Sequence, residues 1–435
     1  MKPPFPRLGS LLALSALCAT LVACGGGGSS ASSASAGSGP APAANPGGAT
    51  TPAGATPPAS LGTSSTDTSV PQSTTPNVQP IAVATAPGLT RNMLTTSVTV
   101  CQPGTSHCAT IDNVQVDTGS QGLRILASAM PSTLALPALS GGGNGGSGAS
   151  AECAVFGGGY TWGAVRSADV RMAGQQASAI PIQVIADPAV PTVPSDCAGS
   201  GRAMQTLATL RANGVLGVGL FTSDCGSGCA STALPRWYYS CAADGTCAAS
   251  AQPVAQQVTN PVSQFPLDNN GVVIDLPAIA DAGAASVSGS MIFGIGTQAN
   301  NVLGNATVLN TNSQTGFVTT TRNGQTYNQS YLDSGSNGYF FSDTQLPQCG
   351  YWYCPSSTQS ASAVIAGTNG TLSAVTFAIG NSSLLFASGN NAFNNLAGIS
   401  SNAFCWGLPF FFGRRVYTAI ASRTTPAGPG PYFAF

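Results

Sequence analysis

The chain contains a short segment that decides its fold, Val116-Asp117-Thr118-Gly119-Ser120. A second copy occurs 216 positions later (333 − 117) as Leu332-Asp333-Ser334-Gly335-Ser336. Each copy follows a predicted strand and leads into another apolar run. A single Asp-Thr-Gly is an ordinary turn sequence, but two copies in matching strand–turn–strand settings indicate one repeated unit in each half of the chain.

The composition leaves few groups for chemistry. Charged residues make up 6% of the 435 residues, against about 25% in average proteins. Lys2 is the only lysine, Glu152 the only glutamate and His107 the only histidine. This excludes a His-rich metal site, a lysine Schiff base, a P-loop and a basic nucleic-acid surface. We therefore expect no metal, no cofactor and no nucleic-acid partner, and proton chemistry carried mostly by Asp.

The N-terminus has the order of a secretory signal, in which Lys2 and Arg7 precede an apolar run from 11 to 23. Thirteen residues are too few to span a bilayer, which takes about 20. The run ends in Leu21-Val22-Ala23-Cys24, which resembles the lipobox of bacterial lipoproteins. We expect residues 1–23 to be a signal peptide and Cys24 to be lipidated. The alternative is an ordinary signal peptide with an incidental cysteine.

Residues 24–90 are predicted to form a tether between the lipidated Cys24 and the folded part. From Gly25 to about Thr85 the sequence is almost entirely Gly, Ser, Ala, Thr and Pro, a composition that cannot bury enough apolar surface to fold. Gly25 after the lipidated cysteine favours the outer membrane, by resemblance to sorting rules in enteric bacteria. We therefore expect a protein of the bacterial cell envelope that is anchored by its N-terminal lipid.

Cysteine usage agrees with export. Eleven of the 13 cysteines follow Cys24, and their spacing lacks the paired CxxC pattern of a zinc site. Disulfides in an oxidising compartment are the better interpretation. Sequence alone does not fix the connectivity, but it suggests five pairs and leaves Cys405 over: 101 with 108, 153 with 197, 225 with 229, 241 with 247, and 349 with 354.

The pattern of the remaining sequence predicts an all-β protein with a few short helices. Asn323-Gly324 between two apolar runs is a strong hairpin signal, because a type I′ turn needs two residues that tolerate positive φ. Helix is expected only near 204–212 and 254–258. The length suggests two β lobes, which we place at 91–300 and 301–435. Strand-length apolar runs recur between turn signals at 97–100, 111–116, 180–185, 272–276, 291–293, 375–379 and 415–420.

Along residues 92–435 the sequence resembles the pepsin-like aspartic proteases, here as a bacterial lipoprotein of an uncharacterised family. A hydrophobic-hydrophobic-Gly element follows each Asp motif, as Val215-Leu216-Gly217 and Cys405-Trp406-Gly407. The segment 156–163, which begins Phe156-Gly157-Gly158, falls where that family has its flap hairpin. Segments 289–294 and 406–417 resemble the strand that closes the first lobe and the late part of the second, although Leu408 replaces the usual acidic residue.

The resemblance implies a bilobal fold of two six-stranded-type β-barrel lobes with a substrate cleft between them. Asp117 and Asp333 would form the catalytic dyad. Two carboxylates in contact hold one shared proton, so that one can activate a water and the other can polarise the scissile carbonyl. In that family Thr118 and Ser334 bond across the lobes, Ser120 and Ser336 support the carboxylates, and the flap holds Phe156, Gly157 and Tyr160.

Two departures from the family pattern concern the flap. Phe156 replaces the usual tyrosine, with Tyr160 as a possible substitute, and Arg124 replaces the tryptophan that hydrogen-bonds that tyrosine. We favour an exposed strand position for Arg124; the alternative places it near Asp117, where it would lower the pKa of that carboxyl.

Two functions follow from this sequence. The first is a membrane-tethered aspartic endopeptidase acting on peptide or protein substrates in the inter-lobe cleft. The second is an inactive binding or inhibitor-like lipoprotein with the same fold. Retention of both Asp residues favours the first function, whereas loss of the flap pair favours the second.

Overall fold

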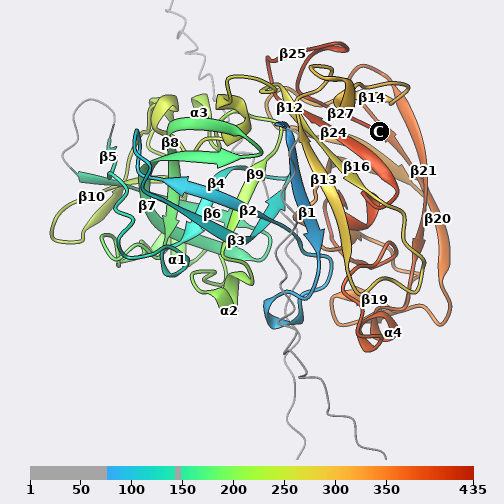
Figure 1. Ribbon diagram of the computed structural model, residues 1–435. Helices are drawn as coiled ribbons and strands as arrows, with labels where there is room; N and C mark the ends of the chain where they lie inside the picture. Colours follow the sequence, from blue (N-terminus) through green and yellow to red (C-terminus); the bar gives the residue numbers. More distant parts are fainter. Residues whose placement is uncertain (1–75, 143–147) are drawn as a thin grey trace, which may run out of the picture.

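A computed structural model describes residues 76–142 and 148–435. These residues form a mostly β protein with a few short helices, built on a large mixed sheet and a second, curled half-barrel sheet (Figure 1). The all-β class expected from the sequence is confirmed at this level. The predicted signal peptide, Cys24 and most of the tether lie outside the described residues. Among the described residues, no helix combines the length and apolar character needed to cross a membrane.

The large sheet has 16 strands. In spatial order they are β11 (Cys247–Ala249), β10 (Tyr238–Cys241), β6 (Gly148–Phe156), β7 (Gly159–Met172), β8 (Gln175–Ile185), β4 (Gln121–Leu126), β9 (Gly214–Val218), β3 (Cys108–Asp117), β2 (Leu94–Cys101), β1 (Val78–Val83), β13 (Val287–Phe293), β12 (Gly271–Leu276), β24 (Arg414–Ala419), β27 (Tyr432–Ala434) and β14 (Val308–Asn310), with β5 (Ser140–Gly141) paired to β6.

The second sheet has nine strands. Their order is β18 (Gln348–Cys349), β19 (Trp352–Tyr353), β22 (Ala397–Ile399), β17 (Tyr339–Phe341), β23 (Phe404–Trp406), β16 (Gln325–Leu332), β15 (Val318–Arg322), β20 (Gln359–Ala366) and β21 (Leu372–Ile379). A separate hairpin joins β25 (Thr424–Thr425) and β26 (Gly428–Pro429). The α-helices are α1 (Ser195–Ala198), α2 (Leu207–Leu210), α3 (Ser227–Ala230) and α4 (Ser382–Ala387).

Local sequence signals account for much of this layout. The expected apolar runs lie in β2, β3, β8, β12, β13, β21 and β24. Asn323 and Gly324 link β15 to β16 with φ of 49° and 77°, so the predicted hairpin is confirmed. The two helical predictions hold only in part: α2 is shorter than 204–212, and the second segment is a 3-10 turn at Val254–Gln256.

One boundary prediction is wrong. Residues 78–83 were expected to belong to the tether, yet they form β1, which pairs with β13 along its whole length and with β2 at its end. Ile81 and Val83 are fully buried there. The two strands lie side by side in the middle of the molecule (Figure 1). Local composition did not predict this strand, because the strand is stabilised by a partner that lies about 200 residues later in the chain.

The two halves of the chain share a core. One apolar cluster runs through both sheets, from Ile81 to Phe433. The large sheet also takes three strands from beyond residue 300: β14, β24 and β27. The lobe boundary near 300 therefore stays a prediction.

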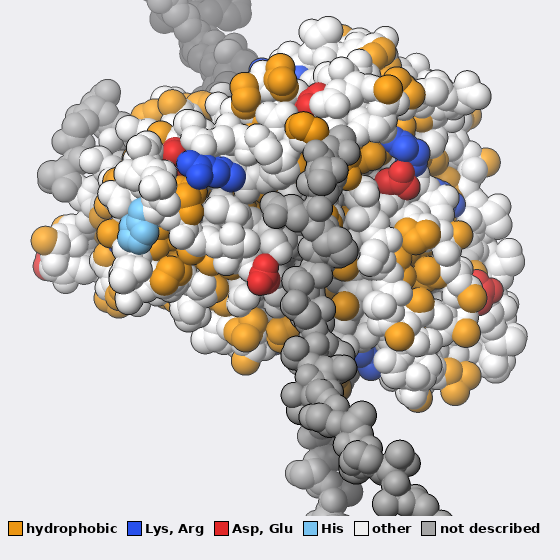
Figure 2. All heavy atoms as spheres, viewed as in Figure 1, with side chains coloured by type: hydrophobic (Ala, Val, Ile, Leu, Met, Phe, Trp, Pro, Cys, Tyr) orange, Lys and Arg blue, Asp and Glu red, His pale blue; other side chains and the backbone are white. Residues whose placement is uncertain are grey.

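All five suggested disulfides form. The longest loop is closed by Cys153–Cys197, which ties β6 to α1. Cys405 takes part in none of the five bonds and is buried. Figure 2 shows only a few separated charged side chains on the face it draws, as expected from the low charge content.

Candidate active site

The two Asp motifs lie at equivalent places in the two sheets. β3 ends at Asp117 and runs parallel to β9, while β4 pairs antiparallel with the other edge of β9. In the second sheet, β16 ends at Leu332, just before Asp333, and β23 lies between β16 and β17 with the same orientations. The elements at 215–217 and 405–407 thus lie beside the Asp loops, where the resemblance expected them.

Reciprocal hydrogen bonds of Thr118 and Ser334 connect the two Asp loops. The Thr118 Oγ1 accepts a hydrogen bond from the Ser334 backbone N–H (3.0 Å) and donates to the Leu332 carbonyl (3.2 Å). The Ser334 hydroxyl does the reverse, accepting from the Thr118 N–H (3.1 Å) and donating to the Val116 carbonyl (2.9 Å). All of these atoms belong to buried contacts, so the network fixes one loop against the other.

The glycines let the carboxyl groups approach. A Cβ on Gly119 would lie 2.7 Å from the Asp333 Cγ, and one on Gly335 would lie 2.6 Å from the Asp117 Oδ1. Both distances are shorter than any tolerated carbon contact. Each loop therefore needs glycine so that the backbone of one half can lie against the carboxyl of the other.

Each carboxyl is held by its own loop. Asp117 accepts from the Gly119 N–H (2.8 Å) and the Ser120 hydroxyl (2.6 Å). Asp333 accepts from the Gly335 N–H (2.8 Å) and the Ser336 hydroxyl (2.6 Å). The structure thus brings these four side chains together.

The dyad is electrostatically coupled. Burial raises the pKa of Asp333 well above its ordinary value, and the charge of Asp117 and a side-chain hydrogen bond to it raise the pKa further. The Ser336 hydroxyl and Gly335 N–H act in the opposite direction. Asp333 thus retains a proton at a pH where an exposed Asp has lost it, and it shares a hydrogen bond with its partner carboxyl.

Cys405 lies close to Asp333, and this contact with the carboxyl was not among the sequence predictions. Its thiol Sγ is 4.0 Å from the Asp333 Oδ2. Because β23 pairs with both β16 and β17, residue 405 is carried under the second Asp loop. Cys405 and Asp333 are both fully buried.

A pocket opens beside Asp117 and is lined in part by the β6–β7 hairpin. Phe156 and Gly158 of this hairpin line it, together with Gly335 and Ser336 of the second Asp loop. Tyr160 does not line it; its ring is buried with Trp162 and Tyr239. Within the described residues, two buried atoms of the pocket walls lack a hydrogen-bond partner: the Asn337 Oδ1 and the Arg211 Nε. Further lining residues are Thr90, Asn92, Met93, Gln115, Arg202, Met204, Thr209, Leu210 and Val215.

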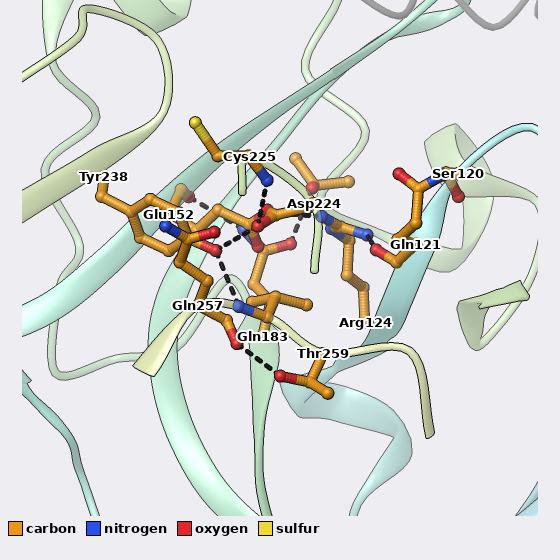
Figure 3. Close-up of polar contacts among 12 residues, drawn as sticks. Ser120, Gln121, Arg124, Glu152, Gln183, Asp224, Cys225, Tyr238, Gln257 and Thr259 are labelled. Carbon is orange, nitrogen blue, oxygen red and sulfur yellow. Dashed lines mark hydrogen bonds and ion pairs between the residues drawn. The ribbon is translucent and has the colours of Figure 1, made fainter. Parts of the chain in front are cut away.

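Arg124 corrects the sequence interpretation, because it is buried and not exposed. Its Nη2 lies 2.5 Å from the Glu152 Oε1 and 3.1 Å from the Asp224 Oδ2, and its Nη1 donates to the Gln121 carbonyl (2.7 Å). Figure 3 shows these side chains converging between the strands. The positive charge of Arg124 is thus matched to these two carboxylates.

Glu152 and Asp224 are therefore a second pair of buried carboxyls, held together around Arg124. Burial raises the pKa of Asp224 well above its ordinary value, and the charge of Glu152 and a hydrogen bond to it act in the same direction. Arg124 and the Tyr238 hydroxyl, which donates to the Asp224 Oδ1 (2.6 Å), oppose this effect. For Arg124, burial lowers the pKa, but the two carboxylates outweigh burial and hold it above the ordinary value.

Sequence reasoning missed this network. Glu152 was noted only as the single glutamate, and Asp224 and Tyr238 carried no motif. The one available signal was a buried-strand arginine, since Arg124 lies within an apolar run. A charge in such a run needs a buried partner, and that argument could have led to Glu152.

These features define a mostly β, disulfide-stabilised protein with two coupled carboxyl pairs. The chain belongs to the family described as "Protein of unknown function (DUF3443)", whose model matches residues 73–435. No curated protein matches the chain.

Proposed function

We propose that this protein is an aspartic endopeptidase with a pepsin-like bilobal fold, in which Asp117 and Asp333 activate a water against a peptide bond. The observation that carries the proposal is the reciprocal bonding of Thr118 and Ser334, which holds the two carboxyls in contact. A scaffold without turnover has no evident need to bury two carboxyls against each other, because this arrangement is costly.

The chemistry follows from the shared proton. Asp333, whose pKa is raised, holds the shared proton in the proposed mechanism. Asp117 takes a proton from a water whose oxygen forms a bond to the scissile carbonyl carbon, while Asp333 gives its proton to the carbonyl oxygen. As the resulting diol collapses, one of its hydroxyl groups returns a proton to Asp333 and the C–N bond breaks. The amine nitrogen leaves with the proton that Asp117 took from the water.

The flap in this proposal is the β6–β7 hairpin. The guanidinium carbon of Arg124 lies 5.6 Å from the Phe156 ring centroid, which is a cation–π contact. This pair stands where the resemblance expects Trp and Tyr. The flap is thus positioned by a buried charge and an aromatic face, without a side-chain hydroxyl.

Cellular placement belongs to the same proposal. Residues 1–23 act as a signal peptide and Cys24 carries the lipid that anchors the protein to the cell envelope, at the outer membrane. Five disulfides among the described residues support an oxidising compartment.

The test uses the chain from residue 73 onward with its disulfides formed. Denatured proteins are incubated with it from pH 3 to 7, with and without a statine-type transition-state analogue. We expect cleavage that peaks at acidic pH and is lost with the analogue and in Asp117→Asn and Asp333→Asn. The matched control is Asp281→Asn, an exposed position outside the pocket. Cleavage that persists in either dyad variant, or keeps rising through neutral pH, contradicts the proposal.

The second candidate is a binding module without turnover. It is favoured by the absence of a hydroxyl at Phe156 on the flap and by the ion pairs that hold Arg124 away from the pocket. It predicts that the analogue binds in an Asp117-dependent manner, while no peptide is cleaved at any pH.

A further inference from the structure

We propose that Arg202 and Arg211 form an anion-binding subsite of the pocket beside Asp117, and that the preferred substrates are acidic peptides. The Asp or Glu side chain of such a peptide lies near the bond that is cleaved. This inference rests on the proposed peptidase function, because it specifies the substrate of the same pocket.

The first guanidinium comes from the segment that borders the flap. The Arg202 carbonyl accepts a hydrogen bond from the Tyr160 N–H (2.9 Å), and Ala203 forms a bridge with Tyr160 of β7. The Arg202 Nη2 donates to the Thr209 carbonyl (3.0 Å). The backbone at 202 is therefore fixed beside the hairpin, and the side chain is directed along α2 at the pocket wall.

The second guanidinium comes from the end of α2. Arg211 is the C-cap residue of this helix and has a φ of 69°. Glycine is the favoured residue in this left-handed conformation. The chain has arginine there instead, despite the backbone strain. The Arg211 Nη1 donates to the Thr90 Oγ1 (2.9 Å) and the Gly88 carbonyl (3.4 Å), which fixes the guanidinium beside Thr90 at the pocket.

The charge of the two residues is unbalanced within the described part of the chain. Arg124, Arg166 and Arg322, which are buried or partly buried, each form an ion pair with a carboxylate. Neither Arg202 nor Arg211 does so among the described residues, and the buried Arg211 Nε has no hydrogen-bond partner there.

The repulsion between the two guanidinium charges also supports an anion-binding subsite. Burial, and then the charge of Arg202, lower the pKa of Arg211. The two guanidiniums are thus close enough to repel each other. An anion between them removes this repulsion and supplies the acceptor that the Arg211 Nε lacks.

The ligand chemistry follows from the pocket itself. Guanidinium groups present paired N–H donors that match a carboxylate. The same pocket contains Asp117 and Gly335 of the proposed dyad site. A carboxylate bound at the two arginines therefore belongs to a chain that also reaches the dyad, and an Asp or Glu side chain of a peptide meets this requirement.

The experiment compares matched peptides in which Glu or Gln occupies each position in turn on both sides of a cleaved bond. It records kcat/KM for cleavage and, with reduced-amide versions that cannot be cleaved, the Kd by fluorescence anisotropy. The proteins are the wild type, Arg202→Gln, Arg211→Gln, the double variant and Arg211→Lys. The matched control is Arg236→Gln, because Arg236 is exposed, lies outside the pocket and also has a positive φ.

We expect Glu to be favoured over Gln at one position by about tenfold or more, the effect of one charge-assisted hydrogen bond. The preference grows from pH 3 to 5 as the Glu side chain ionises and shrinks at high salt. It is lost in the double variant, retained in part by Arg211→Lys and unchanged by Arg236→Gln. Near-UV circular dichroism verifies that each variant is folded.

The outcomes separate the two proposals. Cleavage that depends on Asp117 but shows no Glu preference in kcat/KM or Kd, or a preference that survives in the folded double variant, overturns the subsite and leaves the peptidase standing. A Glu preference in Kd that needs both arginines, without any Asp117-dependent cleavage, supports the subsite and overturns the peptidase.

Discussion

The guanidinium carbon of Arg124 lies 5.6 Å from the centroid of the Phe156 ring. This contact joins the buried network of Glu152 and Asp224 to the hairpin that covers the pocket. The two positions at which the sequence departs from the pepsin-like pattern that it resembles are thus in contact with each other. Once residue 156 lacks a hydroxyl, a hydrogen-bonding tryptophan has no partner, whereas a cation over the ring face does.

Removing the Arg124 charge is expected to destabilise the fold. Arg124→Met leaves two buried carboxyls without their cation, and we expect a loss of about 3–5 kcal/mol in the free energy of unfolding. Urea denaturation monitored by tryptophan fluorescence measures it.

Two comparisons control this prediction. Arg415→Met breaks a half-exposed pair with Asp275 and should cost at most about 1 kcal/mol. Adding Glu152→Gln and Asp224→Asn to Arg124→Met should recover part of the loss. Equal effects at Arg124 and Arg415 would show that the buried network does not carry stability.

The hydroxyl of Thr118 is expected to matter more than its size. Thr118→Val removes the acceptor of the Ser334 N–H and the donor to the Leu332 carbonyl, at a cost of about 1–3 kcal/mol for the buried groups left unpaired. Thr118→Ser keeps the hydroxyl and should cost much less. Thr110→Val, at an exposed threonine pair with Thr99, serves as the control. A similar loss of unfolding free energy in Thr118→Val and Thr118→Ser would contradict the role given to the Thr118 hydroxyl.

Adding a single methyl group to the dyad loop is expected to abolish turnover. In Gly119→Ala the new Cβ would lie 2.7 Å from the Asp333 Cγ, so the carboxyls must move apart. A displacement of about 1 Å in a catalytic group lowers the rate by roughly 100-fold. Gly228→Ala in α3 has its nearest contact at 3.9 Å and should leave kcat unchanged. Full activity of a folded Gly119→Ala variant would contradict the prediction that turnover requires contact between the Asp117 and Asp333 carboxyls.

Stability is expected to fall as the pH rises above about 4. The pKa values of Asp333 and Asp224 are both raised in the folded protein, whereas an unfolded Asp titrates near 3.9. Between that value and the raised pKa the folded state binds more protons than the unfolded state, so the free energy of unfolding decreases with rising pH.

Thermal unfolding from pH 4 to 8 tests this dependence. Asp333→Asn should flatten the decrease, and Asp281→Asn, at an exposed position, should not. If the wild type becomes more stable over this range, other groups dominate and the prediction fails.

Prediction from sequence was accurate wherever the signal was local. The Asn323-Gly324 turn and the four short cysteine spacings need only a few neighbouring residues to be interpreted, and all were confirmed. The fifth pair, Cys153–Cys197, was also confirmed, although its cysteines are 44 residues apart. The prediction failed at Val78–Val83, whose partner strand is remote. It also failed at Arg124: the apolar run around that residue indicated a buried charge in need of a partner, but nothing local identified Asp224.

The sequence by itself determined the β class, the short-range cysteine pairs and the two Asp motifs, since turn residues, strand alternation and cysteine spacing act over short stretches of chain. Only the tertiary structure decided that the Cys405 thiol lies 4.0 Å from the Asp333 Oδ2 and that Arg124 is paired with Glu152 and Asp224. It also decided that Arg202 and Arg211 line one pocket. These relationships depend on strands far apart in the chain being packed together, because burial, and not local sequence, sets which charges must find a partner.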